Sequence, residues 1–258
     1  MSEKIKFNKI NMVIGELVIN NPKKRNALDA QMWADLPEIL NKAQDDKNLK
    51  VLIVRGQGDH FAAGADISEF GSLYATPDSS RKISTHIENA MDALANFPLP
   101  TLAMIRGACV GGGCALALCC DIRFGDDSAK FAITPAKLGL VYPYEDVQRL
   151  IETVGMANAK DMLFSARILN AKAAKKMGLI NFRAKPETLE SRIIDYAQQI
   201  SQLSTGSNKV SKQMCARYQK GQFGNSEETI NLFLSRFASE DFTKGYTAFL
   251  EKRKPDFS

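Results

Sequence analysis

Residues 107–121 are GACVGGGCALALCCD, with three consecutive glycines, Gly111, Gly112 and Gly113, near their centre. They follow an apolar strand pattern at 101–105 and lead into a short apolar helix pattern. Glycine has no Cβ, so a ligand can approach the backbone closely there. The first turn of a helix has unpaired N–H groups and a partial positive charge, which suit an oxyanion. The triplet therefore predicts half of an anion site, with close strand–helix packing as the structural alternative.

A second stretch has the same character. Residues 61–67, FAAGADI, follow a buried-strand pattern at 51–54, and small residues again stand where a strand gives way to a helix. Further segments accompany these two: residues 20–28, NNPKKRNAL, and near the C-terminus residues 237–241, FASED, and 245–254, GYTAFLEKRK. Together, and in this order, the motifs resemble the crotonase superfamily, the enoyl-CoA hydratase/isomerase family, over nearly the whole chain.

The expected fold class is α/β. Strand patterns near 51–55 and 101–105, each after a helical pattern, predict a core of parallel strands. From residue 187 onward, helical patterns continue without a convincing strand. The resemblance implies a crotonase-like spiral of ββα units at 1–186 that binds a CoA thioester, and a helical trimerisation region at 187–258. It also implies a homotrimer, or a hexamer made of two trimers.

Composition limits the other classes of protein. The chain has 258 residues, of which 45% are apolar. It contains no apolar run of about 18 residues or more, the length that would predict a membrane span. The first residues lack the apolar core of a signal peptide, and the last three are not a peroxisomal signal. We therefore expect a soluble, cytoplasmic protein without a membrane partner.

Charge and metal-ligating residues point to a small anionic ligand. Five cysteines, an odd number clustered mostly in one apolar segment, indicate buried reduced thiols. With only His60 and His86 to accompany them, no metal site is expected. The net charge of +5 suits CoA, which enters as part of the substrate and not as a separate cofactor. Basic and aromatic residues do not alternate, so nucleic acid is a weaker alternative as a partner.

The resemblance also assigns the binding residues. The backbone N–H groups of Ala65 and Gly112 are expected to bind the thioester carbonyl oxygen. Two donors aimed at a developing enolate oxygen stabilise it more than the ground state, by roughly 3 kcal/mol each. The CoA is expected to contact Lys23 or Arg25 through its phosphates, Ala63 and Ile67 through its adenine, and Phe249 and Lys252 of a neighbouring subunit.

The acid and base of a hydratase are missing. Enoyl-CoA hydratases of this family carry a glutamate two residues after the last glycine, where this chain has Ala115. The position of their second glutamate falls on Pro135 or Ala136, depending on the alignment. Hydration needs one group to activate water and another to deliver a proton. The sequence therefore predicts a lyase or isomerase that stabilises an enolate, or a non-catalytic acyl-CoA-binding subunit, and not an ordinary hydratase.

Residues 134–145 contain the candidate substitutes for these glutamates. Thr134, Pro135 and Tyr142 are similar to the methylmalonyl-CoA decarboxylase branch of the family, although that branch has a histidine in place of Ala65. Decarboxylation needs an oxyanion site but no strong base, because loss of CO2 itself generates the enolate. Tyr142 is either a pocket wall or a proton donor. Glu145 is either an acid/base group or a solvent-facing side chain.

Three other acidic residues have structural explanations, whereas His86 is a candidate for a chemical role. Asp146 is expected to cap a helix that begins at Val147. Asp66 and Glu69 match a capping box at the start of a helix. His86 lies at the edge of the inward face of a helix expected at 81–96, where the family lines its acyl pocket. A role in double-bond isomerisation therefore stays open for His86.

Overall fold

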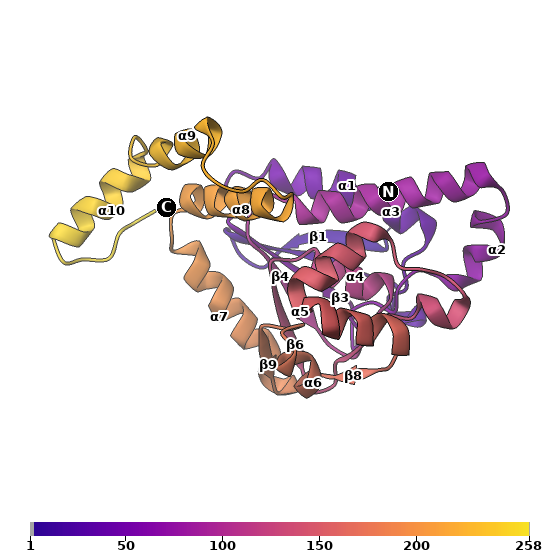
Figure 1. Ribbon diagram of the computed structural model, residues 1–258. Coiled ribbons are helices and arrows are strands. Elements are labelled where there is room, and N and C mark those ends of the chain that lie inside the picture. Colours follow the sequence, from indigo (N-terminus) through magenta and orange to yellow (C-terminus); the bar gives the residue numbers. More distant parts are fainter. Residues whose placement is uncertain (1–2, 258) are drawn as a thin grey trace.

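The computed structural model describes residues 3–257 as two sheets surrounded by helices (Figure 1). The larger sheet pairs six strands in the order β1 (Ile5–Lys9), β2 (Ile14–Ile19), β3 (Val51–Gly56), β4 (Thr101–Ile105), β6 (Ile122–Asp126) and β9 (Phe182–Ala184). The edge pair β1–β2 is antiparallel, and the other pairs are parallel. The smaller sheet pairs β5 (Ala108–Val110), β7 (Lys130–Ala132) and β8 (Leu169–Asn170).

Successive turns of the chain place one strand in each sheet. β4 leads into β5 and then into α4 (Gly112–Leu118), and β6 leads into β7 and then into α5 (Tyr144–Ser165). One turn earlier, β3 leads to Ala62, which forms a parallel bridge with Cys109 of β5. This repetition matches the spiral of ββα units that the resemblance implied, and the α/β class is confirmed.

The larger sheet is covered on both faces, as expected for central parallel strands. Leu52 and Val54 of β3 belong to the main hydrophobic core, together with residues of α1 (Ala30–Gln44), α3 (Pro77–Ala95) and α4. Val51 and Ile53 face the opposite side, where they pack with residues of α7 (Leu189–Ser201). Because side chains alternate along a strand, β3 contributes to both hydrophobic layers.

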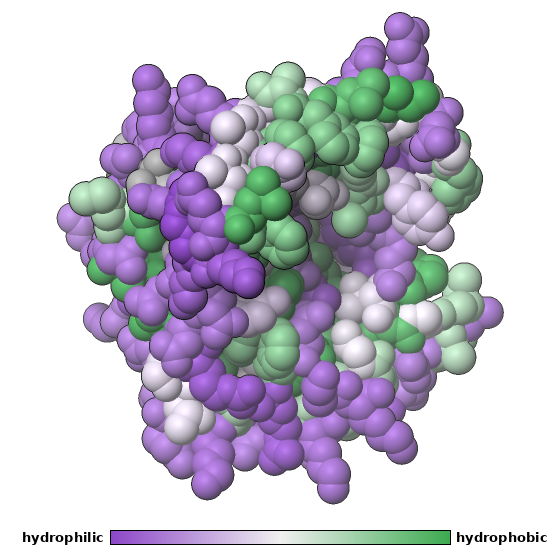
Figure 2. All heavy atoms as spheres, turned by 90° about the vertical axis from the view of Figure 1, so that its left-hand side faces the viewer, coloured by the Kyte–Doolittle hydropathy of each residue, from purple (hydrophilic) through white to green (hydrophobic). Residues whose placement is uncertain are grey.

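The remaining α-helices of the described residues are α2 (Phe70–Leu73), α6 (Ala171–Lys176), α8 (Thr205–Gln219), α9 (Glu227–Ser235) and α10 (Glu240–Leu250). No helix in the described part of the chain is long and apolar enough to cross a membrane. Figure 1 shows α9 and α10 extending away from the sheets. They expose Phe233 and Phe249, and Figure 2 shows hydrophobic patches among hydrophilic side chains on this side. Such surface favours association, but the trimer or hexamer and the boundary at residue 187 stay predictions.

Two helix starts differ from the expectation. α3 begins at Pro77 and not at 81, because the hydroxyl of Thr76 accepts from the N–H of Ser79 at 3.1 Å and Pro77 stands in the first turn. α5 begins at Tyr144, so Asp146 lies inside the helix and does not cap it. The buried carboxylate of Asp146 instead accepts from Nη1 of Arg149 at 3.1 Å.

The contact between α4 and the segment before Ala65 leaves no space for a side chain at Gly113. A Cβ at this position would overlap the carbonyl oxygen of Ala62 and lie 2.8 Å from its carbonyl carbon. We predict that Gly113→Ala lowers the free energy of unfolding by about 2–4 kcal/mol, because backbone atoms must move apart. Gly71→Ala is the control, since a Cβ there meets nothing within 4 Å. Equal urea midpoints for the two variants would contradict this packing.

Candidate active site

Two glycine-containing turns bring the N–H groups of Ala65 and Gly112 together. The segment at 64–66 pairs with Leu28: the N–H of Leu28 donates to Gly64 O and the N–H of Asp66 donates to Leu28 O, both at 2.8 Å. In a parallel bridge of this kind, the N–H of the middle residue, Ala65, points the other way. Gly111 has φ 53° and ψ −122°, a conformation that favours glycine, and α4 begins immediately after it at Gly112.

The distances confirm that the two turns are adjacent. A Cβ on Gly112 would lie 3.5 Å from the nitrogen of Ala65, and a Cβ on Gly64 would lie 3.3 Å from the nitrogen of Gly112. Neither the N–H of Ala65 nor that of Gly112 has a hydrogen-bond acceptor among residues 3–257. Both residues are partly exposed. Two adjacent unpaired donors at the start of a helix can bind one oxyanion.

A narrow, largely apolar cavity of about 10 Å³ lies against Ala65. Its lining comes from α1, α2, α3 and the turn at 64–69, and includes Trp33, Tyr74 and Ile87. The Trp33 side chain is buried, and its Cζ2 would lie 3.4 Å from a Cβ on Gly112. Its indole Nε1 has no hydrogen-bond partner in the described structure. An unsatisfied N–H that is buried away from solvent in this way is unfavourable.

Asp66 and Glu69 line the same cavity but do not form the capping box that the sequence suggested. The Asp66 carboxylate accepts from Ser68 N at 3.1 Å and pairs with Lys24 at 2.5 Å. Burial, the largest influence on its pKa, acts upward, but the hydrogen bonds from Lys24 and Ser68 outweigh it and lower the pKa. Glu69 accepts from the N–H of Ala30 at 2.8 Å, at the start of α1. The two acids therefore hold three different segments around Ala65.

Tyr142 lies behind the glycine turn. Its ring is 8% exposed, and its hydroxyl donates to the carbonyl oxygen of Gly111 at 3.0 Å. Burial raises the pKa of this hydroxyl well above its ordinary value, so the group is protonated at neutral pH. The structure thus gives the hydroxyl a protein acceptor, which neither of the two sequence-based roles for Tyr142 included.

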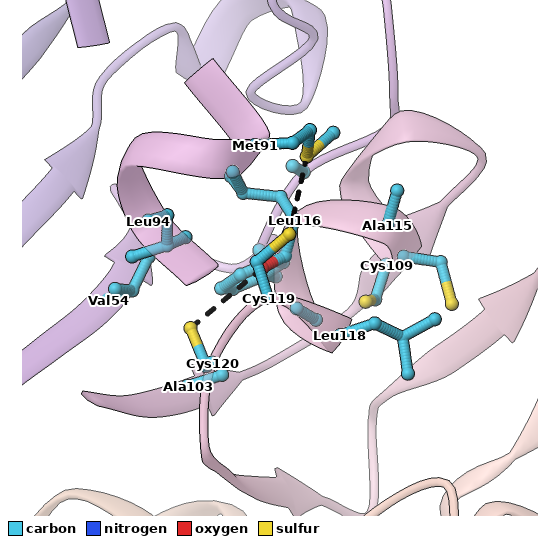
Figure 3. Close-up of a cluster of buried hydrophobic side chains, with 14 of the residues drawn as sticks. Val54, Met91, Leu94, Ala103, Cys109, Ala115, Leu116, Leu118, Cys119 and Cys120 are labelled. Carbon is cyan, nitrogen blue, oxygen red and sulfur yellow. Dashed lines mark hydrogen bonds between the residues drawn. The ribbon is translucent and has the colours of Figure 1, made fainter. Parts of the chain in front are cut away.

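The positions that the resemblance matches to hydratase glutamates, Ala115 and Pro135 or Ala136, border the same turn. Ala115 of α4 is buried, and Figure 3 shows it in the hydrophobic cluster that also contains Cys109 and Cys119. Burial raises the pKa of Cys119 to about 12, so this thiol is protonated and unreactive at neutral pH. Thr134 Oγ1 would lie 3.5 Å from a Cβ on Gly111, which places the 3-10 helix Pro135–Leu138 next to the turn.

Glu145 and His86 lie elsewhere. Glu145 is exposed and its carboxylate lies 3.6 Å from Nη2 of Arg149, which also pairs with Asp92 at 2.9 Å. These residues line a cavity of about 830 Å³ whose lining includes neither Ala65 nor Gly112. His86 lines a shallow surface hollow on α3. Both roles stay predictions, and the structure brings neither side chain to the N–H groups of Ala65 and Gly112.

Glu145 also belongs to an acidic cluster. One oxygen from each of Glu88, Asp92 and Glu145 lies within 4.8 Å of the others. Arg149 forms ion pairs with two of the three and with Asp146. The guanidinium therefore supplies positive charge to the cluster itself.

Four of the expected CoA contacts lie where the segment 23–25 meets the segment 63–67. They are Lys23, Arg25, Ala63 and Ile67. The N–H of Ala63 donates to the carbonyl oxygen of Arg25 at 3.0 Å, and Lys23 precedes Arg25 in an exposed turn. Ile67 is 56% exposed beside Asp66. The sequence analysis did not identify Lys24, whose ammonium group ties this turn to Asp66; a lysine that faces a carboxylate 42 residues away leaves no local pattern.

The other two expected contacts lie far from these segments within one chain. Phe249 is 81% exposed near the end of α10, and Lys252 follows the helix with φ 54°. Figure 1 shows α10 at the opposite end of the molecule from α2. The single chain therefore does not bring them to Ala65, and their contact with CoA stays a prediction that requires a second subunit.

Comparison with known proteins gives one consistent result. The model of the family described as enoyl-CoA hydratase/isomerase matches residues 9–258. The chain is 33% identical over 251 residues to crotonyl-CoA hydratase from Syntrophomonas wolfei, with 93% of each chain covered. It is 32% identical over 248 residues to mitochondrial enoyl-CoA hydratase from Pongo abelii, covering 96% of this chain and 84% of the relative.

Solved structures agree with these matches. An enoyl-CoA hydratase/isomerase family protein from Hyphomonas neptunium superposes with a TM-score of 0.95 at 41% identity, covering 99% of this chain and 97% of the other. An enoyl-CoA hydratase/carnithine racemase from Magnetospirillum magneticum superposes equally well, at 30% identity, and covers 100% and 96%.

Proposed function

Because the chain belongs to the enoyl-CoA hydratase/isomerase family, we propose that it binds an acyl-CoA thioester and stabilises the enolate of that thioester. The N–H groups of Ala65 and Gly112 are the proposed donors to the enolate oxygen. The observation that carries this proposal is that both N–H groups are unpaired and adjacent. Such preorganised donors act more strongly on the transition state than on the ground state.

The reaction is proposed to differ from ordinary hydration. The relatives from Syntrophomonas wolfei and Pongo abelii are named hydratases, but Ala115 and Pro135 or Ala136 provide no carboxylate where the resemblance implies two in the family's hydratases. Asp66 and Glu69 line the cavity, and both carboxylates already accept hydrogen bonds from the protein. A site that keeps the oxyanion donors and lacks a positioned acid/base pair suits a reaction that forms its enolate without a base.

Decarboxylation of a malonyl-type CoA thioester is the reaction that fits this description best. The bond between the α-carbon and the carboxylate breaks, and its electron pair forms the enolate as CO2 leaves. A proton from solvent then adds to the α-carbon. Double-bond isomerisation through Glu145, Tyr142 or His86 has weaker support. Glu145 and His86 line hollows that include neither Ala65 nor Gly112, and the Tyr142 hydroxyl donates to the carbonyl oxygen of Gly111.

The CoA portion is proposed to lie along the exposed turn that contains Lys23 and Arg25, close to Ala63 and Ile67. Positive side chains there suit the phosphates, and the exposed Ile67 suits the adenine face. Phe249 and Lys252 are proposed to complete this site from another subunit of a trimer or hexamer. The exposed apolar residues of α9 and α10 support that assembly.

Incubation with three thioesters and mass analysis of the products tests the reaction. With methylmalonyl-CoA we expect loss of CO2 and formation of propanoyl-CoA, whereas crotonyl-CoA and a 3-enoyl-CoA should remain unchanged. Rapid hydration of crotonyl-CoA would contradict the proposal. Tight CoA binding with no product from any of the three would favour the alternative, a non-catalytic acyl-CoA-binding subunit.

A matched pair of substitutions at Gly112 tests the oxyanion donors. Proline is compatible with the first position of a helix, so Gly112→Pro removes the N–H while α4 can still begin there. We predict a fall in kcat of about 10²–10³. Gly112→Ala keeps the N–H, and its Cβ would lie at ordinary contact distances, 3.4 Å from Trp33 and 3.5 Å from the nitrogen of Ala65, so it should retain more activity than the proline variant. Undiminished kcat in Gly112→Pro would exclude Gly112 N–H as a donor.

A further inference from the structure

Tyr142 contacts the peptide that carries one of the proposed oxyanion donors. Its hydroxyl donates to the carbonyl oxygen of Gly111 at 3.0 Å. The same oxygen also accepts the N–H groups of Cys114 at 2.9 Å and Ala115 at 3.1 Å, from the first turn of α4. The two backbone donors are local, whereas Tyr142 lies 31 residues later in the sequence. The tyrosine therefore connects the glycine turn to the segment that precedes α5.

The geometry of a peptide unit fixes what this contact can do. The carbonyl of Gly111 and the N–H of Gly112 belong to one planar trans peptide, so they point in opposite directions. The Tyr142 hydroxyl consequently lies on the carbonyl side of this peptide, and an oxyanion bound by Gly112 N–H would lie on the opposite side. The hydroxyl of Tyr142 therefore donates its hydrogen bond to the carbonyl oxygen of Gly111 and not to the ligand.

The hydroxyl adds a third hydrogen bond to the two backbone hydrogen bonds that hold the peptide between Gly111 and Gly112. Glycine tolerates several backbone conformations, and Gly111 already has a positive φ of 53°. Rotation of this peptide would turn the carbonyl oxygen, and not the N–H, toward a negatively charged ligand. A hydrogen bond from a buried hydroxyl opposes that rotation, and hydrogen bonds in series polarise one another, which strengthens the N–H as a donor.

We propose that Tyr142 is a positioning residue that orients and polarises the Gly111–Gly112 peptide, so that the Gly112 N–H is directed at the thioester oxygen. This inference rests on the proposed function, because it requires that Gly112 N–H binds that oxygen. It replaces the proton-donor role with an indirect one. It also predicts a moderate effect, since the N–H groups of Cys114 and Ala115 still hold the carbonyl when the hydroxyl is removed.

The test measures the polarisation of a bound thioester. Infrared difference spectra are recorded with acetyl-CoA labelled with ¹³C at the carbonyl carbon. In the unmodified protein, the carbonyl stretch should move to lower wavenumber than in water. In Tyr142→Phe this displacement should be smaller, while the affinity for acetyl-CoA falls by no more than about tenfold. Tyr144→Phe is the matched control, because the Tyr144 side chain is 82% exposed and should leave the stretch unchanged.

A second variant changes the strength of the hydrogen bond without removing the hydroxyl, so its result does not depend on a loss of packing. A ring-fluorinated tyrosine incorporated at position 142 keeps nearly the same shape, and its hydroxyl is a stronger hydrogen-bond donor. It should move the carbonyl stretch further than the unmodified protein does. Burial raises the pKa of Tyr142, which helps the fluorinated hydroxyl to stay protonated at neutral pH. The melting temperature of each variant is measured beside its spectrum.

The outcomes separate the two levels of the proposal. If acetyl-CoA does not bind or its carbonyl stretch does not move in the unmodified protein, the proposed oxyanion site itself is wrong. If the stretch moves in the unmodified protein and moves equally in Tyr142→Phe and the fluorinated variant, the positioning role is overturned. A lower melting temperature with an unchanged stretch would likewise show that Tyr142 is only a packing residue.

Discussion

The close approach of two backbone segments, 62–65 and 111–113, is the constraint on which the candidate site depends. Ala62 O accepts from Val110 N at 3.0 Å, and the chain then turns at Gly111 into α4. A side chain at Gly113 would overlap Ala62, and one at Gly64 would lie 2.9 Å from Val110 O. Because backbone meets backbone without intervening side chains, the N–H groups of Ala65 and Gly112 end up adjacent and unpaired.

This arrangement separates binding from chemistry. The proposed binding of the oxygen uses main-chain N–H groups, so it should survive substitution of the surrounding side chains as long as they stay small. In the proposed account the reaction depends on side chains at separate positions, and Ala115 packs in the hydrophobic core beside the turn without contributing a polar group. Close likeness to hydratases in fold is therefore compatible with a different reaction, because fold and activity rest on different residues.

The sequence predicted the features that are local in the chain. The glycine triplet, the small residues before Ala65 and the helix expected at 81–96 follow from composition and periodicity, and the structure confirms a helix over most of that range, α3. Contacts between distant residues were not predictable in this way. Asp66 and Glu69 have capping-box spacing, but Lys24 and Ala30 N, 42 and 39 residues away, determine where their carboxylates point. The hydroxyl of Tyr142 likewise donates to Gly111, 31 residues away in the sequence, so this contact depends on how the two segments pack.

A crystal structure with a bound, unreactive acyl-CoA tests the central claim most directly. We predict that the thioester oxygen lies within about 3.2 Å of both the Ala65 and the Gly112 nitrogens, the range expected for N–H···O hydrogen bonds. A thioester oxygen that contacts neither nitrogen, with the CoA otherwise ordered in the site, would contradict the account.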